Sequence, residues 1–389
     1  MPMNFKRAKE IMEERGLDAL LASSPENFFY ASDLYIPFVD RFRGFSSGFG
    51  SFALVPLDGE PTLSTTVLDA DLAKKVSTIE DQRYTRTWAY FRRDNHDDID
   101  VYENPVSALA SIVEEKGLEK ATIGIEEKVL PIKDYKEITT KLPDVELVDS
   151  SKTFLDIRAI KVQEEIDRIR RACEISEKGF DAAFSVAKEG ATEADFLGAF
   201  QRAILDEGGY IDKGLIHQNL TIGKHSATVR RGWPLEHKLK EGGIMRFDGG
   251  AIYKGYRCDF ARTRVLGKPS DKAKKVYAAL REAQSRIVDM IEPGVKFSRL
   301  YETGLSTVRE MGDPDFLRGH FGHGLGLITE EEPLVAADND SVIKEDMVLS
   351  IEVPYYWVGV GGFNVEDVVR VTSDGHEVFT PNLHRDLTL

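Results

Sequence analysis

Apolar and polar positions alternate with two different periods along the first part of the chain. Apolar residues recur at helical spacing over Phe5–Met12, and an apolar run typical of a strand follows at Leu17–Ala22. The mixture continues with a strand predicted over Gly50–Val55 and a helix over Val106–Lys116. These patterns predict one α/β domain over residues 1–150.

Longer helical patterns dominate the second part. One runs over about Lys161–Lys188, and a second begins at Thr192 with the spacing of a capping box. Two more are predicted over Ser270–Ile291 and Ser298–Met311, with strand-like segments before and after them. Strands interleaved with pairs of helices indicate an α+β domain over residues 151–389.

Length and charge restrict the class of protein. A chain of 389 residues exceeds what one hydrophobic core usually serves, so two domains are expected. The net charge of −15 disfavours nucleic acids and anionic membranes as partners. No apolar run is long enough to span a bilayer and the N-terminus is charged, so we expect a cytoplasmic protein. Cys173 and Cys258 lie far apart, and no disulfide framework is expected.

The segment Arg246–Gly267 is predicted to form a tight hairpin. Gly255 supplies a turn residue, and a two-residue loop at Lys254 and Gly255 would pair Tyr253 with Tyr256. The turn therefore also predicts the register of the strands on either side.

This register brings two carboxylates to one face. It places Gly250 opposite Asp259, and Asp248 shares the face of Gly250 because side chains alternate along a strand. Diagonal neighbours have backbones roughly 7–8 Å apart, so both carboxylates can reach ions between them. The alternative is a polar outer face of a surface hairpin.

Three further segments place a possible ligand in an apolar or glycine-rich context. His323 lies in Gly322–Gly326, where little side-chain bulk surrounds the imidazole. Glu352 and Glu366 lie among aliphatic residues at strand spacing, an unusual place for an unpaired charge. Taken singly, the histidine could be structural and the acids could be paired with arginines.

Together these residues form a set of four carboxylates and one imidazole. Such a set suits two divalent ions about 3.5–4 Å apart, with a hydroxide between them as nucleophile. Hard oxygen ligands with one histidine favour Mn²⁺, with Co²⁺, Zn²⁺ and Fe²⁺ as alternatives. The five candidate ligands are Asp248, Asp259, His323, Glu352 and Glu366.

The contexts of these residues resemble, in the same order, the metal-binding blocks of the aminopeptidase P, prolidase and creatinase family. The segments are Asp248–Ala251, Tyr256–Thr263, Gly322–Gly326, Ile351–Pro354 and Val365–Asp367. Asp18–Tyr30 and Ile157–Ile166 resemble other parts of the family, so the resemblance covers nearly the whole chain. It implies a creatinase-like N-terminal domain, a "pita-bread" catalytic domain and a homodimer.

The resemblance also implies an activity and a role for each ligand. Family members of the Xaa-Pro dipeptidase or aminopeptidase type hydrolyse the amide bond next to proline in a short peptide. By this likeness Asp259 and Glu366 would bridge both ions, Asp248 would complete one site, and His323 and Glu352 the other. Glu352 is also the candidate proton shuttle.

The chain departs from the family pattern where substrate-side histidines are expected. Arg230 or Arg231 takes the place of one histidine and Glu330 that of another, and His320 is one residue away from the spacing of a third. Asn364 stands two residues before Glu366, where an arginine often braces a metal ligand.

Two interpretations of these changes remain open. An arginine, Arg230 or Arg231, could face Glu330 as an exchanged pair, or it could clamp a substrate carboxylate. These three residues and Glu352 are the candidate catalytic residues. The lost histidines also admit another small-molecule amide or C–N hydrolase, or a lyase, on the same fold. A non-catalytic binding module of the histone-chaperone kind is the third possibility, and the intact ligand set argues against it.

Overall fold

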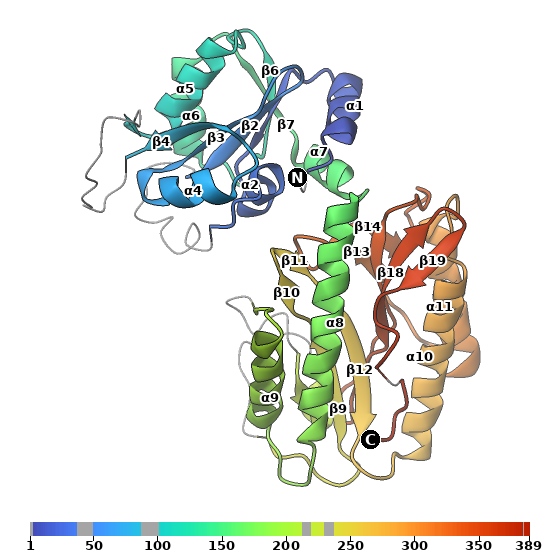
Figure 1. Ribbon diagram of the computed structural model, residues 1–389. Helices are drawn as coiled ribbons and strands as arrows, with labels where there is room; N and C mark the ends of the chain where they lie inside the picture. The colour runs from blue at the N-terminus through green and yellow to red at the C-terminus, as the bar shows by residue number, and fades with distance from the viewer. Residues whose placement is uncertain (1–2, 37–49, 87–100, 212–218, 229–236, 384) are drawn as a thin grey trace. The chain divides into compact units, whose positions relative to one another are not determined.

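The computed structural model describes residues 3–36, 50–86, 101–211, 219–228, 237–383 and 385–389 (Figure 1). It divides the chain into two compact units, Met1–Arg158 and Ala159–Leu389. Over the described ranges, no helix combines the length and apolar character needed to cross a membrane.

The first unit is built on a mixed sheet to which the described residues contribute seven strands, in the order β5-β4-β3-β2-β1-β6-β7. The β1–β2 and β2–β3 pairs are antiparallel and the remaining pairs are parallel. The strands are β1 (Ala19–Ala22), β2 (Phe52–Pro56), β3 (Thr62–Thr66), β4 (Asp81–Thr85), β5 (Val101–Tyr102), β6 (Thr122–Ile125) and β7 (Glu146–Asp149).

Capping residues mark both ends of the first helix of this unit. Asn4 caps the first helix through a hydrogen bond from the Arg7 amide, and Gly16 ends it in the left-handed conformation. The helical segments are α1 (Phe5–Arg15), α2 (Pro25–Ser32), the 3₁₀ turn η1 (Val67–Asp69), α4 (Ala70–Val76), α5 (Pro105–Glu115), α6 (Ile132–Lys141) and α7 (Ser151–Arg158).

Helix α7 belongs to the first unit, whereas a boundary at residue 150 would place it in the second. Hydrogen bonds tie it to α1, among them one from Arg15 Nη2 to the Asp156 carboxylate. Arg7 Nε donates to the Asp156 carbonyl oxygen at 2.9 Å, and Arg15 Nη1 donates to Thr153 Oγ1 at 2.7 Å. These contacts join residues far apart in sequence, so the pattern of apolar positions does not show them.

The second unit contains an antiparallel sheet in the order β14-β13-β15-β18-β12-β9-β8, with β19 paired to β18. Its strands are β8 (Thr221–Ile222), β9 (Ile244–Gly249), β12 (Phe260–Val265), β13 (His320–Gly324), β14 (Glu331–Ala336), β15 (Val348–Glu352), β18 (Glu366–Thr372) and β19 (Gly375–Val378). Two short pairs accompany it, β10 (Ile252–Tyr253) with β11 (Tyr256–Arg257) and β16 (Tyr355–Trp357) with β17 (Gly361–Phe363).

The described residues of this unit also form α8 (Gln163–Ser185), α9 (Glu193–Asp206), the 3₁₀ turn η3 (Gly223–Ala227), α10 (Asp271–Asp289) and α11 (Phe297–Met311). Figure 1 shows α8 and α9 beside β9 and β12, and α10 and α11 toward the β18 side. The helices agree closely with the predicted segments, including the capping box at Thr192.

The helices pack on sheet residues that alternate with the candidate ligands. Phe180 of α8 lies 4.2 Å from Phe260 between ring centroids, and Ile287 of α10 shares a core cluster with Leu349 and Val369. Successive side chains point to opposite faces of a strand, so the residues next to these core positions point to the face away from the helices. The candidate ligands occupy those positions.

Candidate metal centre

The hairpin that carries Asp248 and Asp259 has the predicted register. Tyr253 pairs with Tyr256, and both Lys254 and Gly255 have positive φ angles, as a two-residue hairpin turn requires. The same register continues into the large sheet, where Gly249 pairs with Phe260. The two carboxylates are therefore diagonal neighbours on one face.

A single row of cross-strand partners then runs over four strands. Ala261 of β12 pairs with Asp248 on one side and with Glu366 on the other, and Glu366 pairs with Glu352. Asp259 precedes Ala261 by two positions and lies on the same side of the sheet. The sheet thus gathers four carboxylates from β9, β12, β15 and β18, or from their ends.

Asp259, His323 and Glu366 converge most closely. Each offers a ligand atom within 4.8 Å of the others, and all three are buried. His323 Nδ1 lies 3.0 Å from the Gly324 carbonyl oxygen, and Nε2 lies 3.8 Å from Asp259 Oδ2. A proton on Nδ1 that is donated to this carbonyl leaves the Nε2 lone pair facing the carboxylate, as a metal ligand requires.

Asp248 and Glu352 border this group, and each is held by an arginine. Arg246 Nη1 lies 2.8 Å from Asp248 Oδ2, and Arg318 Nη2 lies 2.5 Å from Glu352 Oε1. His320 Nδ1 lies 3.4 Å from the same Glu352 oxygen. The structure therefore brings all five predicted ligands to one place, three of them in a tight cluster.

The carboxylates act strongly on one another. Burial raises the pKa of Asp259 well above its ordinary value, and the charges on Asp248 and Glu352 raise it further. Burial and the charges on Asp259 and Glu352 likewise raise the pKa of Glu366. Burial also acts to raise the pKa of Glu352, but the positive charge of Arg318 is the largest of the effects that outweigh it, and this pKa is lowered.

This donor set fits divalent cations. Four neighbouring carboxylates carry more negative charge than the two arginines beside them can balance, and an unbalanced charge is costly away from water. Carboxylate oxygens with one imidazole are ligands that first-row divalent ions accept. A bound cation would supply the missing positive charge.

Comparison with known proteins agrees with this reading of the site. The profile of metallopeptidase family M24 matches residues 167–373, and that of the creatinase/prolidase N-terminal domain matches residues 5–160. The chain belongs to metallopeptidase family M24. It is a metal-dependent peptidase with a creatinase-like α/β domain followed by a pita-bread catalytic domain, as predicted.

Relatives of this M24 peptidase match it along most of its length. A Pyrococcus horikoshii protein named Xaa-Pro dipeptidase is 27% identical over 380 residues, which cover 98% of this chain and 97% of that protein. A Staphylococcus aureus protein named as an uncharacterized peptidase is 30% identical over 256 residues, which cover 66% of this chain and 72% of that protein. The solved prolidase of Pyrococcus horikoshii OT3 is 26% identical, with a TM-score of 0.79, and the match covers 98% of this chain and 99% of that one.

Two polar side chains of this M24 peptidase contact the candidate ligands. Ser350 Oγ lies 2.8 Å from both the Asp259 carbonyl oxygen and Glu366 Oε1, and it can donate to one of them at a time. Asn364 Nδ2 lies 3.2 Å from Glu366 Oε2 and 3.4 Å from Asp248 Oδ2. Contacts of this kind orient metal ligands.

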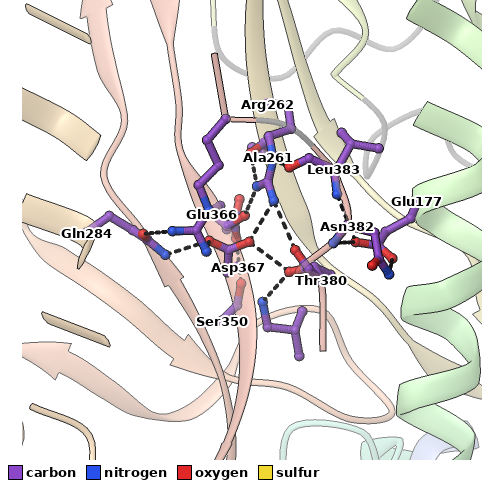
Figure 2. A network of polar contacts seen from close by, with 12 residues as sticks. Glu177, Ala261, Arg262, Gln284, Ser350, Glu366, Asp367, Thr380, Asn382 and Leu383 are labelled. Carbon is purple, nitrogen blue, oxygen red and sulfur yellow. Dashed lines mark hydrogen bonds and ion pairs between the residues drawn. The ribbon is translucent and has the colours of Figure 1, made fainter. Parts of the chain in front are cut away.

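A buried network anchors β18 behind the site (Figure 2). Arg262 donates to Asp367 Oδ1 at 2.7 Å and to the Glu366 carbonyl oxygen at 2.6 Å. Gln284 Nε2 donates to Asp367 Oδ2 at 2.8 Å. Asp367, which follows the candidate ligand Glu366 in sequence, thus points away from the carboxylate row and stabilises the fold.

The structure places some, but not all, of the residues at which the chain departs from the family pattern. Arg230 and Arg231 lie outside the described residues. Glu330 is exposed, yet its negative charge contributes to the raised pKa of Asp259. His320 reaches Glu352 despite its shifted position in the sequence.

Sequence reasoning missed the two arginines of the site. Arg246 had a readable signal, because it stands two positions before Asp248 on a strand and must share its face. Arg318 had none, since its contact with Glu352 depends on how the segment before β13 approaches β15.

Proposed function

We propose that this M24 peptidase is an Xaa-Pro dipeptidase, which hydrolyses dipeptides whose second residue is proline. The proposal rests above all on the single row of carboxylates completed by His323. A relative named Xaa-Pro dipeptidase, similar over nearly the full length of both chains, supports the choice of substrate. A peptide substrate is favoured over other amides because the relatives are peptidases.

We assign two divalent ions to the site, with Mn²⁺ as the first choice. Asp259 and Glu366 are the proposed bridging ligands, since their oxygens lie within 4.8 Å of each other and of the imidazole. Asp248 would complete one ion, and His323 and Glu352 the other. When bound, the ions supply a nucleophile at neutral pH and polarise the scissile carbonyl group.

Glu352 is the proposed proton shuttle. The oxygen of water bonds to the carbonyl carbon, the C–N bond breaks, and the proton lost by the water reaches the proline nitrogen through the Glu352 carboxylate. Arg318 lowers the pKa of Glu352 and so keeps it in the form that can accept this proton. The Glu352 side chain itself is buried.

The test compares substrates and metals in the whole protein. After chelation, the enzyme is assayed with Mn²⁺, Co²⁺, Zn²⁺ or Fe²⁺ against Ala-Pro, Ala-Ala and Ala-Pro-Ala. We expect hydrolysis of Ala-Pro, restored best by Mn²⁺, with Glu352→Gln inactive although still folded. Absence of Ala-Pro hydrolysis with all four metals would overturn the proposal, whereas preference for Ala-Pro-Ala would reassign the enzyme to the aminopeptidase type.

We further propose a homodimer, as the family resemblance implies. Light scattering after size-exclusion chromatography should give twice the mass of one chain. A monomer at micromolar concentration would contradict this assignment without affecting that of the substrate.

A further inference from the structure

Arg246 is a completely buried cation at the edge of the metal centre. Its side chain is 0% exposed, yet it lies on the same strand face as the ligand Asp248. Nη1 donates to Asp248 Oδ2 at 2.8 Å, and Nε donates to the Ser226 carbonyl oxygen at 2.9 Å. The guanidinium carbon lies 5.2 Å from the centre of the Tyr356 ring. This arginine is fixed on three sides.

The setting of Arg246 differs from that of Arg262, which is buried to the same degree. Arg262 donates to four backbone carbonyl oxygens besides its carboxylate partner Asp367. Arg246 Nη2, by contrast, is buried without a hydrogen-bond partner among the described residues. A buried arginine with an unused donor is expensive for the fold, so purely structural needs explain Arg246 less well than Arg262.

The contacts of Arg246 converge on one oxygen of the ligand. Asp248 Oδ2 accepts from Arg246 and lies 3.4 Å from Asn364 Nδ2. Asn364 also reaches Glu366, so the amide links two ligands, and the guanidinium supplies the positive charge that a neutral amide lacks. With Oδ2 engaged in this way, Oδ1 is the oxygen left to face an ion.

We propose that Arg246 is the positioning residue of Asp248, and that it presents the Oδ1 atom to the ion that Asp248 completes. The inference rests on the proposed metal centre. The family pattern predicts an arginine at position 364 that holds a metal ligand, and this chain has Asn364 there. In this chain the positively charged group that holds the ligand is instead Arg246 on β9, two positions before Asp248. Only the ion held by Asp248 depends on Arg246.

The test measures binding of Mn²⁺ alone to the whole protein by calorimetry, after chelation. Loss of a contact that orients a ligand typically weakens metal binding about 10- to 100-fold. We expect Arg246→Gln to weaken one of the two sites by this factor and to leave the other within about twofold. In an Asp248→Asn background the same substitution should have no further effect, because the carboxylate it positions is gone.

Matched variants separate positioning from folding. Arg264→Gln changes an arginine on the neighbouring strand that donates to the Asp386 and Thr388 carbonyl oxygens, and it should leave both Mn²⁺ sites unchanged. If Arg246→Gln fails to fold, Arg246→Lys keeps the charge without the planar fork and should still weaken one site. Asn364→Arg, combined with Arg246→Gln, should restore at least part of the lost affinity.

The outcomes also distinguish this inference from the proposed function. Wild-type protein that binds no Mn²⁺ would overturn both. Wild-type protein with two sites, both retained by Arg246→Gln or by Arg246→Lys, would overturn the role of Arg246 alone. The role of Arg246 would also be overturned if Arg246→Gln weakened Mn²⁺ binding equally at both sites. The same holds if it weakened binding equally in the wild-type and Asp248→Asn backgrounds.

Discussion

Glu352 lies directly opposite Glu366 on the antiparallel strands β15 and β18, and both side chains are buried. Like charges in directly opposed positions destabilise a sheet, and burial strengthens their repulsion. The sheet therefore holds a pair that is unfavourable by itself and becomes favourable when a cation lies between the side chains.

Metal removal should consequently lower the stability of the protein. A ligand present at 100 times its Kd stabilises the folded state by about 2.7 kcal/mol, so chelation should lower the Tm by several degrees, as differential scanning fluorimetry would measure. Glu366→Gln should remove this dependence on metal and raise the Tm of the metal-free protein. A Tm that is insensitive to chelator in the wild type would contradict the cation-balanced pair.

Substitution of Arg318 should change the pH dependence of activity. The positive charge of Arg318 lowers the pKa of Glu352, so Arg318→Gln should raise it. Since the proposed shuttle must be deprotonated to accept a proton, the acid limb of kcat/KM should move to higher pH. Arg318→Lys keeps the charge and should move the limb less. An unchanged acid limb in Arg318→Gln would show that another group controls it.

The exchanged pair inferred from the missing histidines can be tested by a double-mutant cycle. If Arg230 or Arg231 faces Glu330, Glu330→Gln should lower kcat/KM, and the matching Arg→Gln substitution should partly restore it. Coupling of at least about 0.5 kcal/mol would support the pair. Additive losses would instead favour an arginine that acts on the substrate, and a larger effect on KM for dipeptides than for their amides would identify its target as the carboxylate.

Glu165, at the start of α8, should make the stability of the protein pH-dependent. Burial raises its pKa to about 8, although the charge of Lys161 opposes the shift. A carboxyl group whose pKa is raised in the folded state favours folding fully below its unfolded value, and this contribution is lost as the pH rises through the folded value. The relevant window lies between the ordinary value of 4.5 and about 8.

Denaturant unfolding at pH 5 and pH 8 tests this expectation. Glu165→Gln should lose less stability than the wild type between these two values, because the amide does not ionise. The control Glu164→Gln alters the neighbouring, largely exposed carboxylate, which pairs with Arg168, and it should retain the wild-type dependence. Identical pH profiles for Glu165→Gln and the wild type would refute the role of Glu165.

Local rules account for much of what could be predicted. The turn at Lys254 and Gly255 determines the hairpin register, and alternation along the strands then determines the face of Asp248 and Asp259. Capping residues such as Thr192 mark where helices begin. These signals act within a few residues of the features they specify.

Features that depend on contacts between residues far apart in the sequence could not be predicted from these local signals. The ion pair of Arg318 with Glu352 joins residues on segments that meet only when the sheet forms. The place of α7 depends on side chains of α1. Without the fold, nothing near Arg318 or α7 in the sequence distinguishes these partners from many others.

The surface turn at Lys254 and Gly255 determines the arrangement of the candidate metal centre although neither residue is one of its candidate ligands. Loops commonly tolerate inserted residues. Here one added residue would slip the register and turn Asp259 to the opposite face, away from His323 and Glu366. A deletion in that turn would therefore separate the candidate metal ligands although every one of them remained in the sequence.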